Sequence, residues 1–155
     1  MQLRTEIEID APPKIVWQIL VDGSSYHEWN PFITTLTGEL VEDSVINIVV
    51  SPPDVSDLRF RPRVLVAKPE KELRWRGNMF ADVFFVGEHY IQLTDLGGNR
   101  TRVRHGEDFK GFFLKFLGRQ MTATARGFVF MNQALKKRAE AMKNDQSAST
   151  VHDAS

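Results

Sequence analysis

Three ionisable side chains, His89, His105 and Glu107, fall on strand positions that alternation predicts to be buried. In the alternating segments 85–93 and 101–109 they share one face with large apolar residues. A buried imidazole or carboxyl is unfavourable without a partner, so we expect the three to form one hydrogen-bonded or ion-paired cluster. The cluster could anchor the polar end of a ligand, act as general acid and base, or pair His105 with Glu107 structurally. Anchoring and structural pairing are favoured over catalysis.

The same three groups could also ligate a metal ion, because His105 and Glu107 are two residues apart and point the same way from a strand. We predict no metal site, since the sequence supplies no dedicated third ligand and has no cysteine. Glycine-rich phosphate loops, serine nucleophile elbows and zinc-protease motifs are missing from the sequence. We therefore predict no cofactor.

The elements that position these side chains follow an α+β order. Two short helices are expected after the first strand, one opening at Pro12-Pro13 and ending before Asp22, the other over Tyr26–Trp29. Short polar connections between the strands indicate antiparallel pairing. Alternation predicts about seven strands, at 3–9, 33–40, 45–50, 60–66, 73–79, 85–93 and 101–109.

A long helix is predicted from Leu114 to Met142, with one apolar stripe and no proline. A helix about 10–12 Å across cannot cover seven strands, which make a sheet about 30 Å wide, so the sheet must curl around it. Small residues, Thr124, Ala125 and Gly127, lie at the middle of this helix, where a filled core would need bulk. We therefore predict a cavity between sheet and helix.

Large side chains on the inner sheet face and on the helix stripe are the predicted walls of that cavity. Asn132 is informative, because an amide within an apolar stripe needs a partner, which could be a ligand or the backbone. The alternative is that the aromatic side chains fill the space as an ordinary core. The predicted ligand-binding residues are Phe60, Trp75, Phe85, His89, His105, Glu107, Phe109, Met121, Phe128 and Asn132.

Composition is that of an ordinary globular protein. The 155 residues are 42% hydrophobic and 26% charged, with a formal net charge of +0. No stretch approaches the roughly 20 apolar residues that span a bilayer, so we expect no membrane insertion and a cytoplasmic location. We predict one domain over residues 1–143 and a disordered polar tail over 144–155.

Eight arginines are predicted on the outer sheet face, where they could attract anionic lipid or nucleic acid. Glu6, Glu8, Glu72 and Glu88 share that face, so we expect cross-strand ion pairs instead. No aromatic stacking set accompanies the arginines, and we predict no nucleic-acid partner. The arginines are Arg59, Arg61, Arg63, Arg74, Arg76, Arg100, Arg102 and Arg104.

Segments along nearly the whole chain, from about residue 3 to 142, resemble the START-like or SRPBCC superfamily and, within it, the polyketide cyclase/dehydrase branch. They are APPKIVWQIL at 11–20, YHEWNPF at 26–32, LRWRG at 73–77, GEHYIQL at 87–93, TRVRHGEDFKG at 101–111 and RGFVFMNQALKKRAE at 126–140. The resemblance implies a helix-grip fold, in which a curved antiparallel sheet encloses a deep apolar cavity against the terminal helix.

It also implies an entrance bordered by loops around 51–58, 79–82 and 110–113. Phe112 and Phe113 fit that rim, or else they anchor the start of the helix. The fold hosts several functions. The favoured one is binding of an apolar or aromatic small molecule, such as a lipid, polyketide or isoprenoid-like compound. The alternatives are a cyclase or dehydratase that uses His89, His105 and Glu107, and a module that binds a partner protein through its surface.

Overall fold

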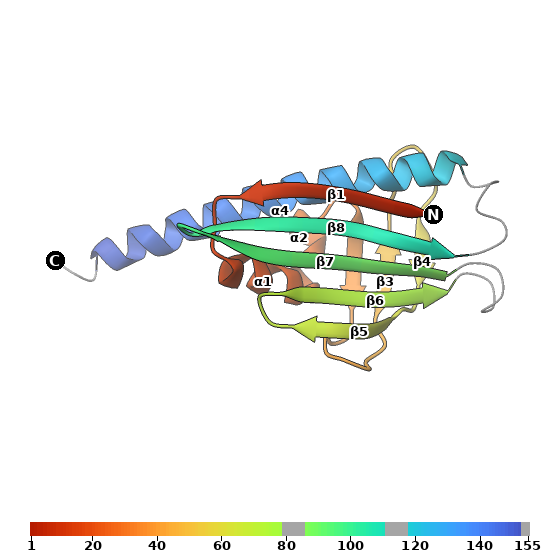
Figure 1. The fold of residues 1–155 in the computed structure, drawn as a ribbon, viewed down its shortest axis with the longest axis horizontal. Coiled ribbons are helices and arrows are strands. Elements are labelled where there is room, and N and C mark those ends of the chain that lie inside the picture. Colours follow the sequence, from red (N-terminus) through yellow and green to blue (C-terminus); the bar gives the residue numbers. More distant parts are fainter. Residues whose placement is uncertain (79–85, 111–117, 153–155) are drawn as a thin grey trace.

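The structure, a computed structural model, describes residues 1–78, 86–110 and 118–152. It confirms the predicted α+β class with a long C-terminal helix against an antiparallel sheet (Figure 1). In chain order the elements are β1 (Gln2–Ile9), α1 (Pro13–Val21), the 3-10 turn η1 (Gly23–Ser25), α2 (Tyr26–Trp29), β2 (Ile33–Thr37), β3 (Asn47–Val50), β4 (Leu58–Phe60), β5 (Arg63–Lys68), β6 (Glu72–Asn78), β7 (Val86–Gly97), β8 (Arg100–Lys110) and α4 (Gly118–His152).

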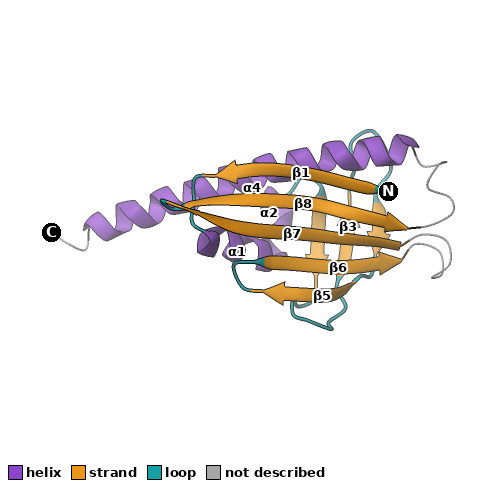
Figure 2. Cartoon of the chain, viewed as in Figure 1, coloured by secondary structure: helices purple, strands orange, loops and turns teal. Residues whose placement is uncertain are grey.

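The described strands form two antiparallel sheets. The larger has the order β1-β8-β7-β6-β5 and the smaller the order β2-β3-β4. In Figure 2 the strands of the smaller sheet run across the direction of the larger one, and α4 runs lengthwise beside β1. The apolar stripe of α4 is buried, with Phe128, Met131 and Leu135 at 0% exposure. The helix-grip arrangement implied by the sequence is therefore confirmed.

The strand predicted over 60–66 is two strands, which belong to different sheets. Pro62 lies between β4 and β5 and has no N–H to donate to a strand partner. Its carbonyl accepts a hydrogen bond from the Ile46 N–H at 3.0 Å, and the Val64 N–H donates to the Ser44 carbonyl at 2.9 Å. These bonds connect the two sheets at the break, so the predicted strand turns a corner at the proline.

Helix α4 differs from its prediction at the C-terminal end. The sequence predicted a disordered tail over 144–155, whereas α4 continues to His152 (Figure 1). Each residue added to a formed helix gains a backbone hydrogen bond without a new nucleation step, so a polar segment can continue a packed helix. Among the described helices, none combines the length and the apolar character needed to cross a bilayer.

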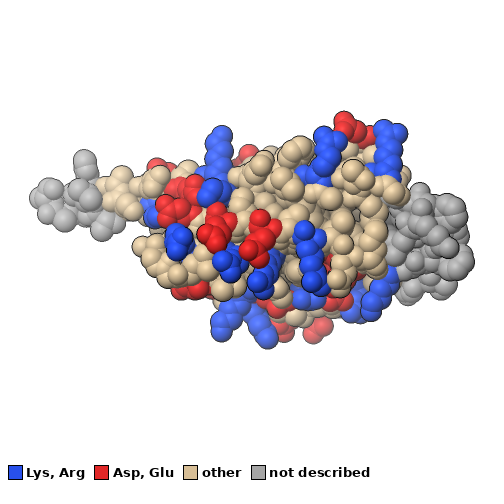
Figure 3. Space-filling view, turned by 45° about the horizontal axis from the view of Figure 1, so that its top comes forward, with Lys and Arg blue, Asp and Glu red and all other residues tan. Residues whose placement is uncertain are grey.

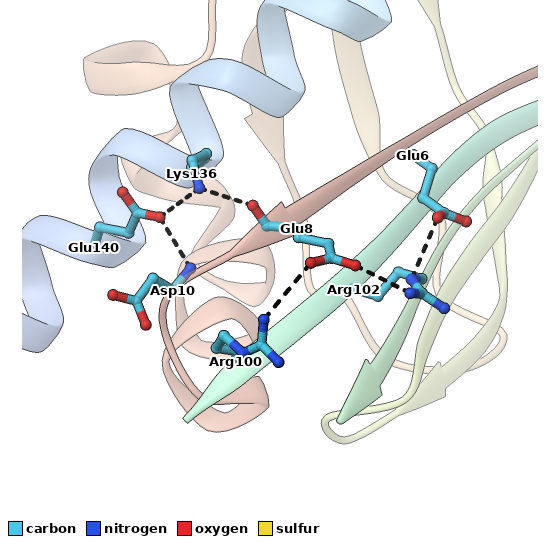
Figure 4. Close-up of polar contacts among 7 residues, drawn as sticks. All are labelled: Glu6, Glu8, Asp10, Arg100, Arg102, Lys136 and Glu140. Atoms are coloured by element: carbon cyan, nitrogen blue, oxygen red, sulfur yellow. Dashed lines mark hydrogen bonds and ion pairs between the residues drawn. The ribbon is translucent and has the colours of Figure 1, made fainter. Parts of the chain in front are cut away.

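Arginine and glutamate side chains pair across the strands on the outer face of the larger sheet, as predicted. Arg102 lies 3.3 Å from a Glu6 carboxylate oxygen and 3.0 Å from one of Glu8 (Figure 4). In the same view Lys136 donates to the Glu8 carbonyl at 2.8 Å and so connects α4 to β1. Figure 3 shows the two signs of charge interleaved on one face. Each exposed pair contributes only about 0–1 kcal/mol.

Gly127 allows α4 to approach Phe32, the residue directly before β2, closely. A Cβ at this position would overlap the ring of Phe32, which is buried and packs edge-on against Phe128 at 5.3 Å. The sequence predicts that Gly127 leaves space for a cavity, but the Phe32 ring occupies that space. The small residue serves the packing of helix against sheet.

We expect Gly127→Ala to lower the free energy of unfolding by about 2 kcal/mol, because overpacking of a buried ring outweighs the gain of about 1 kcal/mol in helix propensity. Urea denaturation measures the change. The matched control is Gly118→Ala in the same helix, where no described atom outside the adjoining helix backbone lies within 4 Å of the added Cβ. That variant should be unchanged or slightly more stable, and equal losses in both variants would contradict the packing explanation.

Candidate functional site

A cavity of about 170 Å³ lies between the strands and α4. An engineered apolar cavity of about 150 Å³ is known to hold benzene, so this space admits roughly one aromatic ring with a small substituent. Among its described lining residues the polar side chains are His89, Glu107, Gln120 and Thr124. The full lining is Phe32, Ile33, Ile48, Val50, Leu58, Phe60, Pro62, Trp75, Gly77, Gly87, His89, Glu107, Phe109, Gln120, Met121 and Thr124.

The structure places the predicted ligand-binding residues in two groups. Those that line the cavity are Phe60, Trp75, His89, Glu107, Phe109 and Met121. By contrast His105, Phe128 and Asn132 are buried in the core and do not line it. Outside the described residues lie Phe85, the predicted entrance loop at 79–82, and residues 111–113 of the predicted entrance loop at 110–113, with Phe112 and Phe113.

The sequence reasoning missed the wall that the smaller sheet contributes. Phe32, Ile33, Ile48 and Val50 line the cavity from the start of β2 and from β3. A signal was present, because Ile46, Ile48 and Val50 are apolar residues at every second position, which is the pattern of a strand with one buried face. All three are buried in the structure. Gln120 carried no such signal: it is an exposed polar residue of α4 that borders the cavity.

His89 lies at the centre of a row formed by three neighbouring strands. Trp75, His89 and Glu107 are directly opposite one another in the registers of β6, β7 and β8. The His89 ring stacks on the Trp75 ring with centroids 4.5 Å apart and planes at 9°. Burial lowers the pKa of His89 to about 3, so its imidazole is neutral near pH 7.

Glu107 completes the row on β8. Its Oε2 lies 3.7 Å from His89 Nδ1, and its side chain retains 19% exposure although it lies inside the fold. Since Glu107 lines the cavity, we attribute that exposure to the cavity. A Cβ at Gly87 would overlap the Glu107 Oε1 atom, so this glycine makes room for the carboxyl group. Burial raises the pKa of Glu107 to about 8, which makes it an O–H donor at neutral pH.

His105 has a different set of partners. Its Nδ1 lies 2.8 Å from Asn132 Oδ1, and because an amide oxygen only accepts, Nδ1 carries the proton. Asn132 Nδ2 donates to the Thr5 hydroxyl at 2.8 Å, and that hydroxyl donates to the His105 carbonyl at 2.9 Å. The Asn132 amide thus meets protein groups on two strands.

The three predicted residues do come together, but not as one hydrogen-bonded cluster. The His105 ring approaches the His89 ring edge-on at 4.8 Å, while Glu107 faces His89. The predicted structural pair of His105 with Glu107 is therefore replaced by His105 with Asn132. Burial and then the nearby His89 lower the pKa of His105 well below its ordinary value, outweighing the Asn132 bond. Within the described residues no group of three or more His, Asp or Glu side chains is arranged to hold a metal ion.

Solved structures share this fold across nearly the whole chain. They include a START superfamily protein from Mycobacterium smegmatis, with TM-score 0.72, 18% identity and coverage of 91% of this chain and 98% of that one. A hypothetical protein from Helicobacter pylori has TM-score 0.73 and 16% identity, covering 90% and 88%. A protein from Mesorhizobium loti has TM-score 0.70 and 18% identity, covering 89% and 96%.

No curated protein matches the chain in a corresponding search. A family model does match, over residues 1–140, and it is described as polyketide cyclase / dehydrase and lipid transport. This confirms the resemblance seen in the sequence, and the chain belongs to the polyketide cyclase / dehydrase and lipid transport family.

Proposed function

We propose that the protein binds an apolar or aromatic small molecule in the cavity between its sheets and α4. The observation that carries the proposal is an interior space of about 170 Å³ with mostly apolar walls and one polar pair, Glu107 and His89, on the side of the larger sheet. Apolar walls with a few placed polar groups are typical of small-molecule sites. Membership of a family that includes lipid-transport proteins agrees with this function.

The size of the cavity restricts the ligand within that class. A space of about 170 Å³ suits a substituted ring or a short isoprenoid better than a long acyl chain. The flat surfaces of Trp75 and Phe109 offer contact area for a ring. The Glu107 O–H would donate to a carbonyl or hydroxyl oxygen of the ligand and so fix its orientation.

We expect Thr124→Phe to weaken binding of acetophenone by at least about tenfold, because the new ring occupies space that the ligand needs. Thr124 is half-buried and lines the cavity from α4. Isothermal titration calorimetry measures the affinity, and circular dichroism checks the fold. The matched control is Thr122→Phe, at an exposed position of the same helix that does not line the cavity. Unchanged binding by Thr124→Phe would place the ligand site elsewhere.

The Glu107–His89 pair also favours a second candidate function, dehydration of a β-hydroxy ketone. His89 would take a proton from the carbon beside the carbonyl while Glu107 gives its proton to the departing hydroxyl, and water leaves. The proton then returns from His89 to Glu107 across the 3.7 Å that separates Nδ1 from Oε2. An imidazole whose burial lowers its pKa to about 3 is a weak base, so binding ranks ahead of catalysis. Turnover of a small aromatic β-hydroxy ketone that stops in Glu107→Gln, with binding retained, would favour the enzyme.

A further inference from the structure

We propose that the cavity selects uncharged ligands carrying a hydrogen-bond acceptor and rejects carboxylates, an inference that rests on the proposed binding function. Among the lining residues that the structure describes there is no lysine or arginine. An anionic group inside the cavity would therefore lose its hydration without gaining a counter-charge, which is strongly unfavourable in an apolar site.

The basic side chains of the adjoining α4 segment are bound elsewhere. Arg126 lies in the same segment as Thr124, and its Nη1 is 2.6 Å from a carboxylate oxygen of Asp54. Arg119 directly precedes Gln120, and it donates to the Asp54 carbonyl at 3.0 Å. Both guanidinium groups thus contact the loop between β3 and β4, and neither lines the cavity.

The polar pair of the cavity also disfavours an anion. Glu107 is itself a carboxyl group, with 19% of its side chain exposed, and Gly87 leaves the room that it occupies. A ligand carboxylate beside Glu107 would have to share a proton with it, as two close carboxyl groups do. His89 is held by its stacking on Trp75 and is too deeply buried to gain charge readily, which its lowered pKa of about 3 reflects.

A neutral ligand with an oxygen acceptor is compatible with the same cavity. A ketone, aldehyde, ester, amide or phenol can accept from the Glu107 O–H without bringing charge into the cavity. The apolar remainder of such a molecule matches the phenylalanine, isoleucine and valine walls. The favoured class is therefore neutral oxygenated ring compounds, and free fatty acids and aryl carboxylates fall outside it.

Three probes of nearly equal size test this selectivity: acetophenone, benzamide and benzoate. In calorimetric titrations of the full chain at neutral pH, we expect the two neutral probes to bind and benzoate to bind at least about tenfold more weakly. Benzoate binding as tightly as acetophenone would overturn the selectivity and leave the binding function intact. Failure of all three probes to bind would overturn the binding function, and the selectivity with it.

A charge introduced at the cavity border gives a second test. Gln120 is exposed and borders the cavity, so Gln120→Arg adds a cation there without disturbing the core. We expect benzoate affinity to rise several-fold and acetophenone affinity to stay the same. The control is Gln133→Arg, which makes the same change in net charge at an exposed position of α4 away from the cavity. No gain in benzoate affinity with Gln120→Arg would show that a missing counter-charge is not the cause of exclusion.

Discussion

Replacing Glu107 with glutamine is expected to raise the free energy of unfolding, by an amount that grows with pH. Burial raises the pKa of Glu107 from 4.5 to about 8, so the folded chain keeps a proton that the unfolded chain releases. Between those two values this carboxyl group by itself lowers the stability of the wild-type protein by roughly 1.4 kcal/mol for each pH unit. Glutamine has no proton to release, so its advantage should reach roughly 3–5 kcal/mol above pH 8.

Urea denaturation of both proteins from pH 5 to pH 9 covers the window that the Glu107 pKa defines. Glu88→Gln is the matched control, on the outer face of β7. Burial acts to raise the pKa of Glu88, but hydrogen bonds from Arg76 and Arg74 outweigh it and lower the value. That carboxylate stabilises the folded state above its unfolded pKa, so its replacement should destabilise across the range. A stability difference for Glu107→Gln that does not change with pH would contradict the buried, protonated carboxyl.

His89 makes the stability depend on pH in the opposite direction. Burial lowers its pKa from 6.5 to about 3, so the unfolded chain binds a proton that the folded chain excludes, and stability falls as the pH drops through that window. The Glu107 effect runs the other way between 4.5 and about 8. The two contributions offset each other where the windows overlap. Burial of this pair therefore favours a protein that is most stable in mildly acidic solution.

Period-two alternation accounts for what the sequence could predict about this site. It placed His89 and Glu107 on the inner faces of β7 and β8, and it placed Arg74, Arg76 and Arg102 on the outer face of the larger sheet. Position along a strand determines the face of a side chain, so a local pattern is enough for such predictions. In the register of β6 and β7, Trp75 lies opposite His89, so both side chains are on the face that alternation predicts to be buried.

Hydrogen-bond partners that come from distant segments of the chain could not be predicted from the sequence. Asn132 lies 27 residues from His105 and 127 residues from Thr5, and no local pattern links them. The contribution of β2 and β3 to the cavity depends on how the second sheet crosses the first. The break at Pro62 creates that crossing. Alternation alone does not reveal the break, because the apolar residues on both sides of it keep the same two-residue period.

Asn132→Leu is expected to lower the free energy of unfolding by about 3 kcal/mol, although leucine has the same branched shape and favours helix. The substitution leaves the His105 Nδ1–H without its acceptor and takes the Asn132 donor from the Thr5 hydroxyl. Urea denaturation near neutral pH measures the loss. Gln133→Leu is the control, because it removes an exposed amide from the next position of the same helix. Similar losses of stability in the two variants would show that the hydrogen bonds of the buried Asn132 amide do not stabilise the fold.

The acetophenone affinity of the Asn132→Leu protein then tells whether Asn132 only supports the packing beside the cavity or contacts the ligand directly. Asn132 does not line the cavity, but it holds His105, whose ring stacks on Phe128 at 4.1 Å and touches His89 edge-on. If Asn132 acts only through this packing, the folded variant should bind acetophenone with an affinity within a few-fold of wild type, while Thr124→Phe loses binding in a stable fold. A variant that keeps its stability but loses the ligand would instead make Asn132 a direct contact.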